Sequence, residues 1–281
     1  MQVRVEGQPV YAYTGGVAFD PAQPAVVFLH GAQHDHSVWI LQSRYFAHHG
    51  YAVLALDLPG HGRSEGEPLP TIEALGRWVV AALDAFGVAS ATLVGHSMGS
   101  LIALEVAGAA PDRVRSIALV GTAFPMKVSD ALLAAAREDE ARAFDMINFW
   151  SHSTINARPG SPAPGFSIFN QNRRLMERQK PGVLTVDFSA CNAWQGGFDR
   201  VDALRCPTLF VLGARDAMTQ PRFARALIER AAKAAVAAGV TAPHVVEIPD
   251  CGHAIAAEAP GALRDALGTF LRAARPATLS R

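Results

Sequence analysis

The sequence predicts an α/β fold, with a doubly wound and mostly parallel sheet into which a helical segment is inserted. Short apolar runs alternate with helix-length stretches along most of the chain, and the alternation stops once, over residues 127–203. Half of the 281 residues are hydrophobic and 18% are charged, which permits a large core and excludes global disorder. One domain with an insertion accounts for this length.

The predicted strands are compact apolar runs bounded by Gly, Pro or Asp, as expected of parallel strands covered on both faces. They occupy residues 25–29, 52–56, 91–94, 117–120, 208–212 and 245–248, after two opening strands at 3–6 and 10–13. Helices are predicted between them at 72–86, 101–108, 222–238 and 260–273. Such alternation implies right-handed crossovers and a doubly wound sheet.

The inserted segment has no convincing buried strand. Helices are predicted at 129–152, 166–178 and 183–194, and the Pro/Gly-rich residues 158–165 are predicted to form a loop. We therefore expect a core made of residues 1–126 and 204–281 and a helical cap at 127–203. The last residues, 276–281, are expected to fray.

Charge and N-terminal composition bear on partners and location. Lys plus Arg equals Asp plus Glu at 25 each, so there is no electrostatic case for nucleic acid or an anionic membrane surface. Residues 1–6 lack the pattern of a signal peptide, and the apolar runs are too interrupted to span a bilayer. We expect a soluble, cytoplasmic protein, whose zero net charge permits a homodimer without requiring one.

Cofactor and metal signatures are absent from the sequence. Cys191, Cys206 and Cys251 are widely spaced, which argues against a disulfide framework or a thiolate zinc site and favours small buried side chains. The run His34-Asp35-His36 has no second cluster to complete a metal site, and we expect it to form a polar rim at a pocket entrance. No lysine follows a glycine and no Gly-x-Gly-x-x-Gly opens a helix after the first strand, so no nucleotide cofactor is predicted.

The segment Gly95-His96-Ser97-Met98-Gly99 stands between a predicted strand and a predicted helix. Gly-x-Ser-x-Gly in that context is the sequence form of a nucleophile elbow. The turn is so sharp that the serine is strained and a side chain at either glycine would meet neighbouring backbone. Ser97 is therefore the predicted nucleophile.

A serine hydroxyl needs a base, and the base needs an acceptor that orients it. His253 follows the last predicted strand and Asp216 follows the strand at 208–212, so both lie at the same sheet edge as Ser97. The order Ser97, Asp216, His253 is nucleophile, acid, base. His96 is adjacent to Ser97 but faces the wrong way round the elbow.

An acyl-transfer site also needs two N–H donors for the developing oxyanion. The residue after the nucleophile, Met98, supplies one. Ala32, in the tight turn that follows the strand at 25–29, is the candidate for the second.

Taken in order, these motifs resemble the α/β-hydrolase superfamily over residues 3 to about 271. The matching positions are His30-Gly31 with Trp39, the run Asp57–Ser64, the elbow, Gly213-x-x-Asp216 and Gly252-His253. The resemblance implies an eight-stranded sheet, a cap after the sixth strand and a cofactor-free hydrolase. Ser97 departs from the haloalkane dehalogenase and epoxide hydrolase pattern, which has Asp at the elbow. The turn after His30 also lacks the Gly-Pro-Gly of many C–C hydrolases.

The expected activity is hydrolysis of a small-to-medium, mainly apolar carboxylic ester through an acyl-Ser97 intermediate. Apolar residues expected near the nucleophile are Phe124, Met126, Met146, Trp150, Phe166, Phe169, Trp194, Met218 and Ile255. The same triad leaves open a C–C hydrolase, lactonase, thioesterase, hydroxynitrile lyase or cofactor-free haloperoxidase. A receptor that binds a small ligand with little turnover is the alternative from outside the enzymes.

Overall fold

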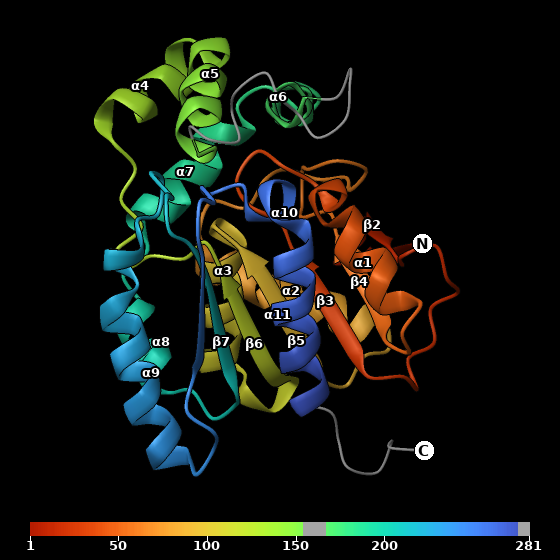
Figure 1. Cartoon of the computed structure of the whole chain (residues 1–281). Helices are drawn as coiled ribbons and strands as arrows, with labels where there is room; N and C mark the ends of the chain where they lie inside the picture. Colours follow the sequence, from red (N-terminus) through yellow and green to blue (C-terminus); the bar gives the residue numbers. More distant parts are fainter. Residues whose placement is uncertain (154–166, 275–281) are drawn as a thin grey trace.

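A computed structural model describes residues 1–153 and 167–274 (Figure 1). Within them lies one eight-stranded sheet of order β1-β2-β4-β3-β5-β6-β7-β8. Its strands are β1 Gln2–Val5, β2 Gln8–Tyr13, β3 Ala25–Leu29, β4 Ala52–Leu56, β5 Ala91–His96, β6 Val114–Val120, β7 Thr208–Gly213 and β8 His244–Ile248. Only the β1–β2 and β2–β4 pairs are antiparallel. The predicted doubly wound, mostly parallel fold is confirmed.

The strand at 245–248 departs from the expected burial on both faces. β8 is the last strand of the sheet and pairs only with β7. Of its five residues only Ile248 is buried, and Val245 is 47% exposed. An apolar run of this length is therefore compatible with an edge strand as well as with a central one.

Helices cover both faces of the sheet, as the alternation predicted. The helices on one face are α1 Ile40–Ala47 and α11 Pro260–Ala273, and those on the other are α2 Ile72–Ala85, α3 Met98–Ala109 and α9 Arg225–Ala238. Alternate residues of each central strand, β3 to β7, enter opposite core clusters: in β3, Val27 and Leu29 pack with α2 and α3, whereas Val26 and Phe28 pack with α1. The backbone of these central strands is thereby packed from both sides.

Among the described residues between β6 and β7 there are five helices: α4 Asp130–Glu138, α5 Glu140–Ser151, α6 Ile168–Glu177, α7 Val183–Ala193 and α8 Gly197–Asp202. The single helix expected at 129–152 is broken at Asp139, whose carboxylate accepts the N–H of Arg142 and caps α5. Helices α4–α7 share their own apolar cluster and group beyond one end of the sheet (Figure 1). Because α8 packs on α3 and α9 instead, we propose that the cap consists of α4–α7.

Short helical segments complete the described chain. These are the 3-10 helices His36–Trp39, Pro111–Arg113 and Pro221–Phe223, and the single turn α10 Ile255–Glu258. No helix among the described residues is both long and apolar enough to cross a bilayer. The predicted loop at 158–165, Phe166 and the tail at 276–281 lie outside the described residues.

Candidate active site

Ser97 stands between β5 and α3 with φ 52° and ψ −118°, a backbone conformation that L-residues rarely adopt. The glycines on either side make the turn feasible. A Cβ at Gly95 would overlap the backbone of Gly99, and a Cβ at Gly99 would overlap the carbonyl of Leu29. The elbow therefore tolerates no side chain at these two positions.

Asp216 and His253 form a hydrogen-bonded pair after β7 and β8. The Nδ1–H of His253 donates to Oδ2 of Asp216 at 2.8 Å, and both residues are buried. The other oxygen, Oδ1, accepts the backbone N–H groups of Met218 and Thr219 at 2.8 and 2.7 Å. Burial alone would raise the pKa of Asp216, but its interactions with His253 and Thr219 outweigh burial and lower it. Asp216 is therefore an ionised acceptor that fixes one His253 tautomer.

Thr219 was not anticipated from the sequence. Its Oγ1 lies 2.7 Å from Oδ2 of Asp216, 2.9 Å from the carbonyl oxygen of Gly121 and 3.0 Å from Nδ1 of His253. A threonine three residues after an aspartate in a turn is a known local signal, because the carboxylate can accept the threonine's N–H. That signal could have found it.

The turn after β3 lies against Ser97. A Cβ placed on Gly31 would come 3.3 Å from Cβ of Ser97. Ala32 and Ser97 line the same cavity, and Met98 is the first residue of α3, where helical N–H groups lack partners within the helix. Of the two residues expected to form the oxyanion hole, Met98 thus follows Ser97 in the chain and Ala32 lines the same cavity as Ser97.

His96 packs beside the catalytic candidates without competing with His253. Its Nε2–H donates to the carbonyl oxygen of His253 at 2.8 Å, and the two ring centroids are 4.7 Å apart. Burial, reinforced by the charge that His253 acquires on protonation, lowers the pKa of His96 to about 3. His96 is therefore neutral at physiological pH and serves as a donor to the His253 backbone.

The residues of the predicted polar rim join the core to the cap. His34 donates from Nδ1 to the carbonyl oxygen of Ala32 at 2.7 Å, and its Nε2 lies 2.8 Å from Oδ1 of Asn172 in α6. Gln33 donates its backbone N–H to Asp187 in α7 at 2.8 Å. The turn that carries Ala32 is thereby tied to two cap helices.

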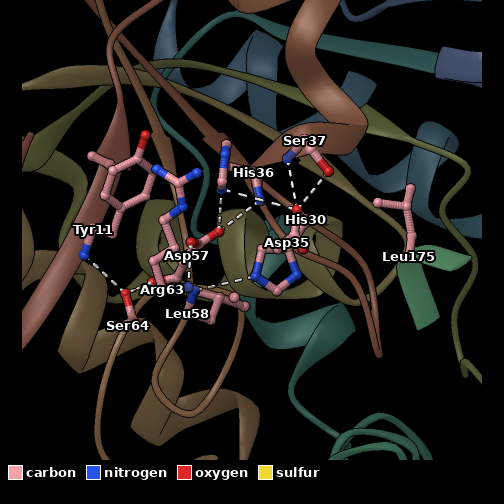
Figure 2. A network of polar contacts seen from close by, with 12 residues as sticks. Tyr11, His30, Asp35, His36, Ser37, Asp57, Leu58, Arg63, Ser64 and Leu175 are labelled. Atoms are coloured by element: carbon pink, nitrogen blue, oxygen red, sulfur yellow. Dashed lines mark hydrogen bonds and ion pairs between the residues drawn. The ribbon is translucent and has the colours of Figure 1, made fainter. Parts of the chain in front are cut away.

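Asp35 and His36 are also used structurally, as Figure 2 shows in part. The buried Asp35 carboxylate accepts hydrogen bonds from Ser37, Gln179 and both donors of the Arg178 fork. These bonds outweigh the effect of burial and lower the pKa of Asp35. Most of these donors come from the end of α6 and the segment after it, so Asp35 is a second attachment point for the cap.

Three ligand-type residues, Asp35, His36 and Asp57, have side-chain atoms within 4.8 Å of one another. Oδ1 of Asp57 accepts the N–H and Nδ1–H of His36 at 2.7 Å, and Oδ2 accepts the N–H of Arg63 at 2.8 Å (Figure 2). Since these atoms are already paired within the protein, nothing in the cluster calls for a metal ion.

His61 makes a third contact with the cap. Its Nε2 lies 2.9 Å from Oδ2 of Asp187, and both side chains are almost fully buried. Burial alone would lower the pKa of His61, but the charge and hydrogen bond of Asp187 outweigh it and raise the pKa. The pair is a buried ionic contact between the segment after β4 and α7.

Ser97 and His253 open onto one cavity of about 430 Å³ below the cap. Three of the expected pocket residues line it, namely Met126, Trp150 and Met218. Sequence reasoning missed the rest of residues 126–129 and 217–220, together with Leu132, Phe188 and Cys191. The two runs lie a few residues after the ends of β6 and β7, at the same sheet edge as Ser97, and this position is the signal that could have identified them.

Five of the apolar residues expected near Ser97 do not line this cavity. Phe124 packs edge-on against Trp194, whose Nε1–H donates to the buried Glu105 at 3.2 Å. Ile255 is fully buried in the core on the α1–α11 face, and Met146 packs on the cap's own cluster. Phe169, also expected near the nucleophile, does not line it and packs 5.6 Å from His152. Each of these side chains serves packing within a layer of the fold instead.

Comparisons with known proteins agree with this architecture. The chain is 27% identical over 274 residues to the putative carbamate hydrolase RutD of Klebsiella pneumoniae, which covers 91% of this chain and 95% of that protein. Over 123 residues it is 38% identical to the dihydrolipoyllysine-residue acetyltransferase component of the acetoin cleaving system of Cupriavidus necator. That match covers 43% of this chain and 30% of the relative, so the chain spans less than a third of the relative's length.

A thermophilic esterase from Thermogutta terrifontis has the same fold, with a TM-score of 0.81 at 20% identity over 98% of this chain and 99% of that one. The model of the family described as alpha/beta hydrolase fold matches residues 24–260, which is most of the chain. With the elbow, the sheet order and this match in agreement, the chain belongs to the alpha/beta hydrolase fold family.

Proposed function

We propose that the protein is a serine hydrolase that cleaves a small-to-medium, mainly apolar carboxylic ester. The observation that carries this proposal is the placement of Ser97, at a strained elbow, in one cavity with the His253 ring that Asp216 orients. Nucleophile, base and orienting acid are the minimum set for acyl transfer through a serine.

In the proposed reaction, His253 takes the proton of the Ser97 hydroxyl as its oxygen attacks the ester carbonyl. The ionised Asp216 stabilises the imidazolium that forms, and the N–H groups of Ala32 and Met98 hold the oxyanion. The imidazolium then gives its proton to the alcohol oxygen as the carbon–oxygen bond breaks. In the second half, His253 takes a proton from water as the water attacks the acyl carbon, and the imidazolium returns that proton to the Ser97 oxygen as the acid leaves.

The size and lining of the cavity support the substrate class. A volume of about 430 Å³ lies within the range of small-molecule sites. Apolar side chains of Met126, Val128, Leu132 and Phe188 form much of its wall. The exposed Lys127 also lines it, so the wall is not wholly apolar.

A carbamate is the second candidate substrate. The observation in its favour is similarity over 91% of the chain to a protein named a putative carbamate hydrolase. A carbamate carbonyl would accept attack by Ser97 in the same geometry. Lactones, thioesters and vinylogous diketones also present a carbonyl that Ser97 would attack. Measured rates, and not the geometry of the site, distinguish these substrate classes.

The test is steady-state hydrolysis of p-nitrophenyl esters from acetate to dodecanoate, with Ser97→Ala as the matched control. We expect turnover that disappears in the control, with a chain-length optimum that reports the size of the cavity. Side-by-side rates on a lactone, a thioester, a carbamate and a vinylogous diketone rank the alternatives. A folded protein without Ser97-dependent turnover on any of these substrates would contradict the proposal and favour a ligand receptor.

A further inference from the structure

A second cavity of about 460 Å³ adjoins the first. It lies among residues 34–41, α6 of the cap and the α10 turn. Ser97 does not line it. Among the described residues, His253 is the only one that lines both cavities. The catalytic base therefore stands between two spaces of similar volume, and the proposed reaction mechanism occupies only one of them.

The wall of the second cavity is mainly apolar and holds an unused donor. Val38, Leu41, Ile168 and Leu175 contribute aliphatic side chains. Trp39 also lines the cavity; it is fully buried, and its indole Nε1–H has no hydrogen-bond partner among the described residues. A buried N–H without an acceptor is uncommon in native structures, and a ligand oxygen would supply one.

The charged groups of this wall are already engaged. Glu258 is the acidic residue among those that line it, and its two carboxylate oxygens accept the backbone N–H groups of Gly252 and Ser153. His96 donates to the carbonyl of His253, and His34 is bonded to Ala32 and Asn172. The wall is therefore suited to an uncharged group.

Ester cleavage separates the substrate into an acyl half, which stays on Ser97, and an alcohol half, which is protonated by His253. The acyl carbon binds Ser97 and the carbonyl oxygen faces the oxyanion donors, all at the first cavity. The alcohol oxygen must instead reach His253, because that residue returns the proton when the carbon–oxygen bond breaks. The substituent on that oxygen leaves from His253, the residue that both cavities share.

We propose that the second cavity binds the leaving alcohol of the substrate, an uncharged alkyl or aryl alcohol with an acceptor oxygen for the Trp39 N–H. This inference rests on the proposed ester hydrolysis and extends it. The enzyme then has separate sites for the two halves of its substrate. The first cavity determines the preferred length of the acyl chain, and the second determines the preferred length of the alcohol.

The test measures two series of substrates with the wild type and with two variants. Alkyl acetates from methyl to octyl lengthen the alcohol, methyl alkanoates from acetate to decanoate lengthen the acid, and methyl acetate is common to both. Leu175→Trp narrows the second cavity, and Val128→Trp is the matched change in the first. Rates are followed by titration of the released acid, and each kcat/KM is divided by the value for methyl acetate with the same variant.

We expect Leu175→Trp to lower the octyl acetate ratio about tenfold or more, and the methyl decanoate ratio less than about twofold, because several methylenes lose their apolar surroundings. Val128→Trp should do the reverse. A Leu175→Trp variant that lowers both ratios equally, or only the decanoate ratio, would overturn the assignment. Taking ratios within one variant removes differences in folded fraction.

The donor is tested with Trp39→Phe, which keeps a ring and removes the N–H. The wild type should prefer 2-butoxyethyl acetate over heptyl acetate, which has the same chain length without the ether oxygen. We expect this preference to fall about threefold to tenfold in the variant, as for loss of one hydrogen bond. An unchanged preference would show that Trp39 does not bind the alcohol.

Different results would refute the role of the second cavity and the serine hydrolase function. Ser97-dependent turnover with ratios that do not separate would refute the second cavity's role and leave the serine hydrolase in place. Absence of Ser97-dependent turnover on every ester would refute both.

Discussion

The two sides of the active site are held in place by different interactions. On the sheet side, Ser97 and Asp216 follow strands whose side chains enter both core clusters, and His253 follows the edge strand β8, which pairs with β7. On the cap side, polar contacts such as the buried His61–Asp187 pair and the half-buried Asp35–Arg178 pair connect segments more than a hundred residues apart. Changes in charge should therefore act on cap attachment more than on the geometry of the three sheet-borne residues.

The largest expected effect comes from removing a sheet-borne residue. Ser97→Ala and His253→Ala should each lower kcat by roughly 10⁴-fold to 10⁶-fold, since the three residues act as a unit. The circular dichroism spectrum and the melting temperature should stay close to those of the wild type. Retention of most activity by either variant would show that the assignment is wrong.

Substitutions that break the contacts of the cap should lower the stability of the protein. Asp187→Asn leaves the buried His61 without its anionic partner, and we expect the free energy of unfolding to fall by about 3 kcal/mol. Urea denaturation at pH 6 measures this change. The exposed pair Arg264–Asp265 provides the control, because Asp265→Asn at the surface should cost less than about 1 kcal/mol. Equal losses in the two variants would contradict the buried attachment.

The same pair predicts a dependence on alkaline pH. Because the pKa of His61 is raised on folding, its stabilising contribution is complete below the unfolded value near 6.5 and is lost as pH rises through the folded value. Urea midpoints measured from pH 6 to 9 should therefore fall for the wild type and fall less for Asp187→Asn. Parallel curves for the two proteins would show that protonation of His61 does not contribute to stability through Asp187.

Acid should destabilise through other histidines. The pKa values of His30, His96 and His152 are lowered, chiefly by burial, so protonation below pH 6.5 favours the unfolded chain. For His96, with a pKa of about 3, the loss between pH 6.5 and 5 is about 1–2 kcal/mol. His96→Gln should reduce the slope of unfolding free energy against pH in that interval. A slope equal to that of the wild type would contradict burial of the neutral ring.

The smallest expected effect is at Thr219. Thr219→Val removes the hydroxyl between Asp216 and His253, and we expect kcat to fall about fivefold to tenfold with KM little changed. Thr219→Ser should restore most of the rate, because it keeps the hydroxyl. A serine variant as slow as the valine variant would indicate that the methyl group's packing matters instead.

The same contrast explains what could be predicted from the sequence. The elbow and the positions of Asp216 and His253 depend on motifs a few residues long, each directly after a strand, so local pattern sufficed. The cap contacts depend on pairs such as Gln33–Asp187, which have no local signature.

The direction of apolar side chains was harder to predict, because a core and a pocket attract the same residue types. Trp194 was expected in the pocket, yet its Nε1–H is held by Glu105 and the ring packs on Phe124. The division of the expected helix at 129–152 likewise depends on Asp139 acting as an N-cap, and the sequence does not distinguish this aspartate from the other charged residues of the segment.

Cys191 has a practical consequence for counting active sites. It lies in the wall of the first cavity near Ser97, yet the residue is buried and burial raises the pKa of its thiol. Cys206 and Cys251 are also buried, with the thiol pKa raised to about 12 in each. At neutral pH the thiolate forms that react with electrophiles are scarce. A fluorophosphonate should therefore label one serine per chain without interference from thiols, so its stoichiometry measures the concentration of competent enzyme directly.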